Sequence, residues 1–187
     1  RSSLDPLQTG DYGSEYQQIS RDGSTVVFIS AASDLVTGVA DGNGTGNDLF
    51  AYDIMWGTVT AINLVTSGSS TGDYPVDTTF SVSDNGKVVA FSSYATDLHP
   101  LKSDTTWDVF VRDLSVPFTG VELVSVNNLG DKADSTAYRP RLDASGNIVA
   151  FESSASNLST LPTSWVNNVY IRDRVASTTH LISVNSS

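Results

Sequence analysis

Four carboxylate or amide side chains are grouped in one glycine-rich segment, residues 41–48. Carboxylate and amide oxygens are the ligands that calcium prefers, and the glycines between them would let the backbone curl around a cation. The bidentate glutamate of an EF-hand is missing, and a polar turn explains the same composition. We expect a turn here, with Asp41, Asn43, Asn47 and Asp48 as the candidate ligands if calcium binds, and no other cofactor.

Loop aromatic residues are the second group that could do chemistry. Trp107 and Trp165 fall in equivalent loops, and an indole ring in a loop can stack on a sugar ring or a peptide side chain. The alternative is that both rings fill space between neighbouring structural units. We name Trp107, Trp165 and the nearby His99 as candidate ligand-binding residues.

Catalytic sequence motifs are missing. The chain has no G-x-S-x-G or H-E-x-x-H segment, and its only histidines are His99 and His180. It has no cysteine, which excludes disulfides, thiolate zinc sites and thiol catalysis. We therefore expect no catalytic residue and favour a non-enzymatic protein.

The composition limits the possible partners. The formal charge of −11 and the pI of about 4.2 disfavour nucleic acid and anionic membranes. No apolar run is long enough to span a membrane. Because the sequence starts at Arg1 without a methionine or a signal peptide, we expect a processed chain or an excised piece of a longer one.

The elements that must position these residues are copied three times. An apolar run closes on Phe28, Phe91 and Phe151, which are 63 and 60 residues apart. A second segment, closing on Asp53, Asp113 and Asp173, recurs every 60 residues. A fixed period of this size indicates one supersecondary unit repeated in tandem.

Each copy contains four short segments rich in β-branched and aromatic residues, separated by glycine and Asx turns. Asp22-Gly23 and Asn85-Gly86 are typical of type I′ hairpin turns. The fourth strands are predicted at 59–66, 121–126 and 178–184. Helical periodicity is missing, and four antiparallel strands in tandem copies describe β-propeller blades better than a sandwich. The predicted fold is all-β, with one domain over 1–187 and three four-stranded antiparallel blades at approximately 15–66, 78–126 and 138–184.

Recurrent charged residues are expected to have structural roles. Asp53, Asp113 and Asp173 end their strands in every copy, where Asx side chains accept hydrogen bonds from turn backbone. Arg112 and Arg172 beside them are expected to make exposed ion pairs.

The segments Ser83-Asp84-Asn85-Gly86-Lys87-Val88-Val89-Ala90-Phe91-Ser92-Ser93 and Asp108-Val109-Phe110-Val111-Arg112-Asp113 resemble the TolB-type, WD-repeat-like propeller repeat. This resemblance implies that the first strand of each blade is innermost and the fourth outermost. It also implies a bacterial periplasmic or secreted location, and it leaves the function open because such repeats serve many roles.

Three blades are too few for a closed propeller, which usually has four to eight. We expect a homodimer that closes a six-bladed ring head to tail, with a longer chain that supplies the missing blades as the alternative. Residues 1–14 resemble the end of a preceding blade, because Thr9-Gly10-Asp11-Tyr12 repeats Thr71-Gly72-Asp73-Tyr74.

Long loops and interblade linkers gather on one face of the predicted blades, and tight turns on the other. Loops on a rigid scaffold are where binding residues concentrate. We therefore expect a non-enzymatic recognition or scaffold module that binds a protein or glycan through the long-loop face. The alternatives are a glycan-active hydrolase or lyase with its site at the central channel, and a purely structural half-propeller.

Overall fold

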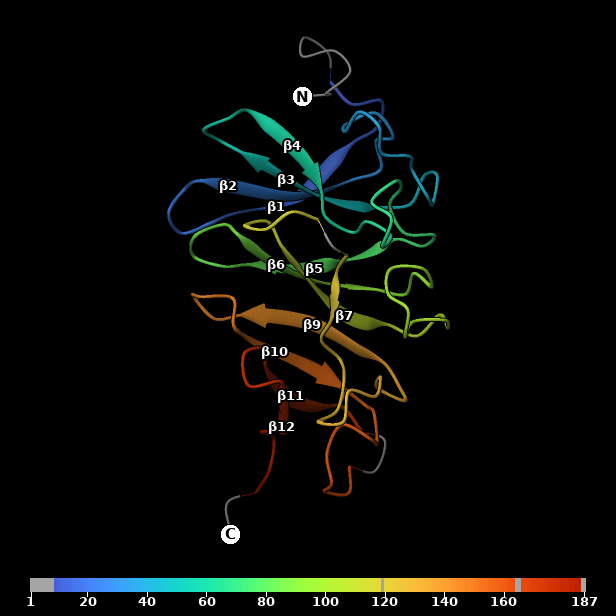
Figure 1. Cartoon of the computed structure of the whole chain (residues 1–187), viewed down its shortest axis with the longest axis vertical. Coiled ribbons are helices and arrows are strands. Elements are labelled where there is room, and N and C mark those ends of the chain that lie inside the picture. The colour runs from blue at the N-terminus through green and yellow to red at the C-terminus, as the bar shows by residue number, and fades with distance from the viewer. Residues whose placement is uncertain (1–8, 119, 164–165, 186–187) are drawn as a thin grey trace.

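The computed structural model describes residues 9–118, 120–163 and 166–185, which form twelve strands in three antiparallel sheets and no helix (Figure 1). The sheets follow one another along the longest axis of the molecule, and each is wound in chain order. This arrangement agrees with the predicted all-β class and with three four-stranded blades.

The first blade contains β1 (Ser14–Ile19), β2 (Thr25–Ser30), β3 (Asp48–Asp53) and β4 (Thr58–Ala61). The second contains β5 (Val76–Val82), β6 (Val88–Ser93), β7 (Asp108–Asp113) and β8 (Glu122–Leu123). The third contains β9 (Ala137–Leu142), β10 (Ile148–Ser153), β11 (Asn168–Asp173) and β12 (Thr178–Leu181).

One aromatic pair stands at the same cross-strand position in every blade. Phe28 lies opposite Phe50, and the equivalent pairs are Phe91 with Phe110 and Phe151 with Tyr170. Their ring centroids are 5.8, 5.6 and 5.8 Å apart. We call the sheet face that carries this pair the leading face and the opposite one the trailing face. Cross-strand aromatic pairs of this kind stabilise a sheet and help to fix its register.

The blades pack leading face on trailing face. Leu49 and Ile62 on the trailing face of the first blade share a buried cluster with Phe91 and Phe110 of the second. The trailing face of the second blade packs in the same way against Phe151 and its neighbours in the third. The core of the described residues therefore contains two interblade layers and a third buried cluster in the first blade, formed by Ala32, Leu35, Phe50, Ala61 and Leu64.

The fourth strands are shorter than the sequence predicts. They end at Ala61, Leu123 and Leu181, although the apolar runs continue. In the first two blades the chain turns after these strands: the amide of Leu64 donates to the carbonyl of Ile62 at 3.0 Å, and that of Val126 to the carbonyl of Val124 at 2.8 Å.

The first hairpin turns are not of type I′. Only Gly23 and Gly86 have positive φ, of 72° and 68°, whereas that turn requires two such residues. The Gly23 amide donates to the Ser20 carbonyl at 2.9 Å, so the glycine is the last residue of the turn. A type I turn closed by a left-handed glycine explains both observations.

Arg112 and Arg172 do not form the predicted exposed ion pairs. Both side chains are buried, and burial lowers the pKa of each guanidinium. Arg112 lies over the ring of Phe118 at 4.5 Å, and Arg172 donates to the Thr179 hydroxyl at 3.2 Å. They pack beneath the outer part of the blade rather than facing solvent.

No helix in the described residues is long and apolar enough to cross a membrane.

Candidate functional site

The long loops and the linkers between blades gather along one side of the stack, on the right in Figure 1, and the tight hairpins lie along the other. The first strands of the second and third blades, β5 and β9, begin on the long-loop side, and β7 begins there as well. Residues at these three strand starts therefore lie on the same side of the second and third blades.

An open hollow of about 460 Å³ lies at this place. Six of the described residues line it: Asp77, Thr78, Thr79, Trp107, Tyr138 and Arg139. The predicted ligand-binding residue Trp107 thus lines a cavity together with residues of β5 and β9. Sequence reasoning missed the other five because they come from two strands about 60 residues apart.

β-Bulges place the strand residues in the hollow. The β5–β6 register shifts between Val76 and Phe80, and β9 is irregular between Tyr138 and Arg141. Arg139 takes a positive φ of 55° within this irregularity. A bulge re-aims side chains that an ideal strand would point elsewhere, which brings these residues to the rim.

Trp107 is held by neighbours from the second blade and the linker before it. Its ring meets Tyr94 edge-on at 4.4 Å, and Tyr94 contacts Tyr74 at 5.1 Å. The Trp107 carbonyl accepts a hydrogen bond of 2.8 Å from the Ala137 amide at the start of β9. The indole is half-buried, so one part is fixed while another borders the hollow.

The polar groups of the hollow are partly organised by one another. The Asp77 carboxylate accepts from the Thr78 amide at 2.7 Å and from the Thr79 hydroxyl at 2.6 Å. Arg139 pairs with Glu152 at 3.2 Å and lies 5.2 Å from the Tyr138 ring centroid. The site therefore offers a fixed carboxylate, hydroxyls and a guanidinium beside two aromatic rings.

The other predicted ligand-binding residues are not brought to the hollow. His99 is not among its lining residues, and its Nδ1 accepts from the Leu101 amide at 3.2 Å. Burial lowers the pKa of His99, which favours a neutral ring. Trp165 lies outside the described residues. His180 is exposed on the outermost strand, where its ring contacts the Thr178 hydroxyl.

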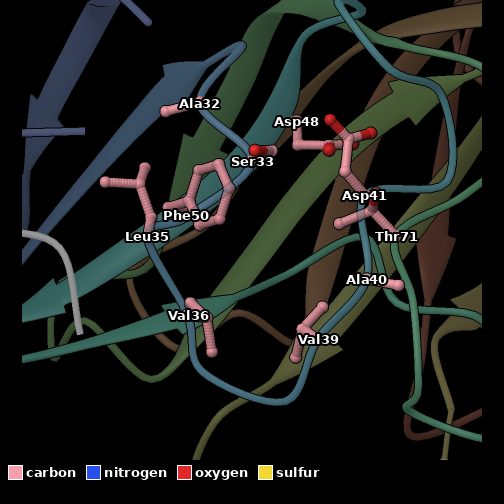
Figure 2. A pocket seen from close by; sticks show the side chains of 10 residues that line it. All are labelled: Ala32, Ser33, Leu35, Val36, Val39, Ala40, Asp41, Asp48, Phe50 and Thr71. Atoms are coloured by element: carbon pink, nitrogen blue, oxygen red, sulfur yellow. The ribbon is translucent and has the colours of Figure 1, made fainter. Parts of the chain in front are cut away.

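Figure 2 shows that Asp41 and Asp48, the first and last residues of the glycine-rich segment, line one small pocket. The Asp41 carboxylate accepts from the amides of Asn43 and Gly44 at 3.0 and 2.7 Å. The Asn43 amide nitrogen donates to Asp48 at 2.9 Å. Asp41 and Asp48 line a cavity of about 10 Å³, room for roughly one water molecule.

Only part of the predicted calcium ligand set converges here. Neither Asn43 nor Asn47 is among the lining residues, and the described part of the chain holds no group of three or more His, Cys, Asp or Glu side chains suited to a metal ion. Burial raises the pKa of Asp48 to about 6, although Asn63 donates to it at 2.7 Å. The calcium site stays a prediction.

In the second blade, the equivalent carboxylate, that of Asp108, has lysine side chains as partners. Asp108 is buried like Asp48, but the ammonium groups of Lys132 and Lys102 lie 3.1 and 3.5 Å from it. Lys102 also pairs with Asp104 at 2.8 Å. Burial opposes ionisation of Asp104, yet hydrogen bonds from Lys102 and Thr106 prevail and lower its pKa. Lysine ammonium groups thus lie beside Asp108, whereas the side-chain amides of Asn43 and Asn63 contact Asp48.

The recurrent strand-end aspartates accept hydrogen bonds within their turns. Asp53 accepts from the amides of Met55 and Trp56 at 2.9 and 3.0 Å. Asp113 accepts from the Ser115 amide at 2.8 Å, and Asp173 from the Ala176 amide at 2.8 Å. These contacts are those of Asx turns, which leave the three aspartates a structural role.

The comparisons with known proteins identify a fold and no family. No protein-family model matches the chain, and no curated protein does. Among solved structures, the tricorn protease is similar at 14% identity with a TM-score of 0.57, covering 97% of this chain and 18% of that one. One of two prolyl endopeptidases is similar at 14% identity with a TM-score of 0.53, covering 94% and 22%.

TolB from Acinetobacter baumannii matches 94% of this chain and 45% of its own length at 14% identity, but its TM-score of 0.38 is too low to assign this chain to its family. The chain spans about a fifth of the length of the two peptidases. At such identities only the fold carries over, and these neighbours are propeller proteins. The three sheets described above are therefore successive blades of β-propeller type.

Proposed function

We propose that this chain is a non-enzymatic recognition module that binds carbohydrate in the hollow between Trp107, Tyr138 and Arg139. The observation that supports it most is the meeting of a fixed indole with a carboxylate, hydroxyls and a guanidinium around one open cavity. Sugar rings present an apolar face beside polar hydroxyls, and an aromatic ring next to planar polar groups matches both.

The hollow fits binding better than hydrolysis. Glycoside hydrolysis usually needs two carboxyl groups across the scissile bond, and Asp77 is the single acid among the described residues that line the cavity. Both oxygens of Asp77 already accept hydrogen bonds from Thr78 and Thr79. A glycan ligand is also consistent with the periplasmic or secreted location that the sequence predicts.

The test is a screen of soluble neutral and acidic oligosaccharides, followed by calorimetry on the best binder with wild type and Trp107→Ala. Truncating a central aromatic contact commonly costs about 2 kcal/mol, roughly a thirtyfold loss of affinity. Trp56→Ala is the matched control, because Trp56 is 76% exposed in the turn after β3 at the opposite side.

Equal affinity of Trp107→Ala and wild type would remove the named site. Binding of peptides without any oligosaccharide would replace the glycan by a protein ligand at the same place. Breakdown of the bound oligosaccharide would instead favour the hydrolase or lyase alternative.

A further inference from the structure

The trailing face of the third blade lacks the cover that the same face has in the other blades. Val169 and Ile182 are 38% and 47% exposed, whereas Leu49 and Ile62 at the same positions of the first blade are 0% exposed. The equivalence follows from the backbone, because the Ile62 and Ile182 amides donate to the carbonyls of Leu49 and Val169 at 2.8 and 2.9 Å. The next blade is what covers Leu49 and Ile62.

The leading side of the first blade is open at its first strand and at Phe28, whereas Phe50 on the same face is buried in a cluster with Ala32 and Leu35. β1 is exposed along its whole length, and its Ile19 is 61% exposed. The corresponding Val82 of the second blade packs against the interblade core. Phe28 is partly exposed, although Phe91 and Phe151 at its position are fully buried.

The hairpin turns give the clearest sign that the two surfaces match. A Cβ added to Gly86 would lie 2.6 Å from Cβ of Thr25 in the preceding blade, and one on Gly146 would lie 2.6 Å from Cβ of Val88. In the second and third blades, the first hairpin turn thus packs against the start of the second strand of the preceding blade. A Cβ added to Gly23 would meet none of the described residues within 4 Å, and Ile148, at the position of Thr25 and Val88, is only partly buried.

We propose that a second copy of this chain covers these surfaces, with the first blade of one copy packed against the third blade of the other. The chain therefore carries both halves of one further interblade contact. The turn at Gly23 in the first blade has no second strand packed against it, and the start of β10 at Ile148 in the third blade has no turn packed on it, among the described residues. Forming the contact twice around a two-fold axis closes a ring of six blades, which leaves no blade face in water.

The experiment is sedimentation analysis of the 187-residue chain over a range of concentrations. We expect a species of about 40 kDa, twice the 19.9 kDa of one chain. Val169→Glu and Ile182→Glu place a charge in the proposed contact, and each should weaken dimerisation by about tenfold or more. Val175→Glu is the matched control, because Val175 is 77% exposed in the β11–β12 turn, and it should dimerise like wild type.

Circular dichroism and urea unfolding of each variant at low concentration verify that the monomer stays folded, which exposed positions tolerate. A monomer at every concentration would overturn the proposal. Assemblies larger than a dimer would show an open head-to-tail chain instead of a closed ring, and a dimer insensitive to both glutamates would place the interface elsewhere. Either result overturns it as well.

Discussion

At the scale of single residues, the buried carboxylate at the start of the third strand has different hydrogen-bonding partners in the first and second blades. Asp108 lies next to two lysine ammonium groups, whereas Asp48 has the amide groups of Asn43 and Asn63. Burial is the largest influence on both carboxyls and raises the pKa of each, although the lysines oppose it at Asp108; at Asp48, whose amide partners carry no charge, the pKa rises to about 6.

This difference predicts that Asp48→Asn stabilises the protein at neutral pH. A carboxyl whose pKa is raised in the folded state costs stability as pH rises from its unfolded value of 3.8 to about 6. Above pH 6 the loss of unfolding free energy amounts to about 3 kcal/mol. A neutral amide at this position would avoid that loss while keeping one oxygen that accepts hydrogen bonds. Urea unfolding at pH 4 and pH 8 measures the effect, with a gain expected only at pH 8.

If Asp48→Asn were less stable than wild type at pH 8, the ionised carboxylate of Asp48 would stabilise the folded protein, which contradicts the prediction. Repeating the unfolding with calcium examines the predicted cation site. A bound cation raises the melting temperature of wild type and leaves Asp48→Asn unchanged, because ligand binding stabilises only the state that binds.

At the scale of elements, each interblade linker is fastened to the loop after the second strand by a reciprocal pair of Asx residues. Asp73 accepts from the amide of Thr96 at 2.7 Å, and its own amide donates to Asp97 at 3.1 Å. Asp11 with Asp34 and Asp134 with Asn157 repeat this clasp in the other blades. It explains why the four-residue segment beginning at Thr9 recurs at Thr71.

The clasp predicts that Asp97→Asn stabilises the second blade. Burial and the negative charge of Asp73 raise the pKa of Asp97, whereas Asn157 accepts from Asp134 without repulsion and also donates to the Lys132 carbonyl at 2.8 Å. One added hydrogen bond is worth about 1 kcal/mol. The gain should be larger at pH 7 than at pH 4, because a raised carboxyl pKa costs stability as pH rises.

The reverse substitution, Asn157→Asp, is the matched control and should destabilise the third blade at pH 7. Both variants are measured by urea unfolding under identical conditions. Changes of the same sign in the two variants would contradict the role given to the clasp.

At the scale of the whole molecule, stability is expected to depend on which blades have neighbours. Phe91 is fully buried between the first and second blades, and Phe28 at the same position of the first blade is partly exposed. Phe91→Ala should cost about 3–5 kcal/mol, as truncation of a buried aromatic residue does. Phe28→Ala should cost less in a dilute sample, and the gap should narrow as concentration rises if a second copy covers it.

Chemical denaturation at two protein concentrations measures both variants. A loss below about 1 kcal/mol for Phe91→Ala would mean that the interblade layer does not hold the molecule together.

The sequence by itself determined the repeat, the all-β class, the strand order and the side on which the long loops lie. These follow from local signals, because strand periodicity and turn chemistry depend on residues close in the chain. The sequence also indicated Trp107 as a candidate ligand-binding residue, because a tryptophan in a predicted loop can be recognised without knowing which residues it contacts.

The tertiary structure decided which residues from different elements come into contact. The hollow beside Trp107, the burial of Arg112, the lysines around Asp108 and the clasp at Asp73 all join residues from different strands, loops or linkers. Local patterns cannot specify such contacts, because they arise only when bulged strands and neighbouring blades are set side by side in space. The number of repeats already implied open end faces, and the structure showed which residues of the first and third blades are exposed there.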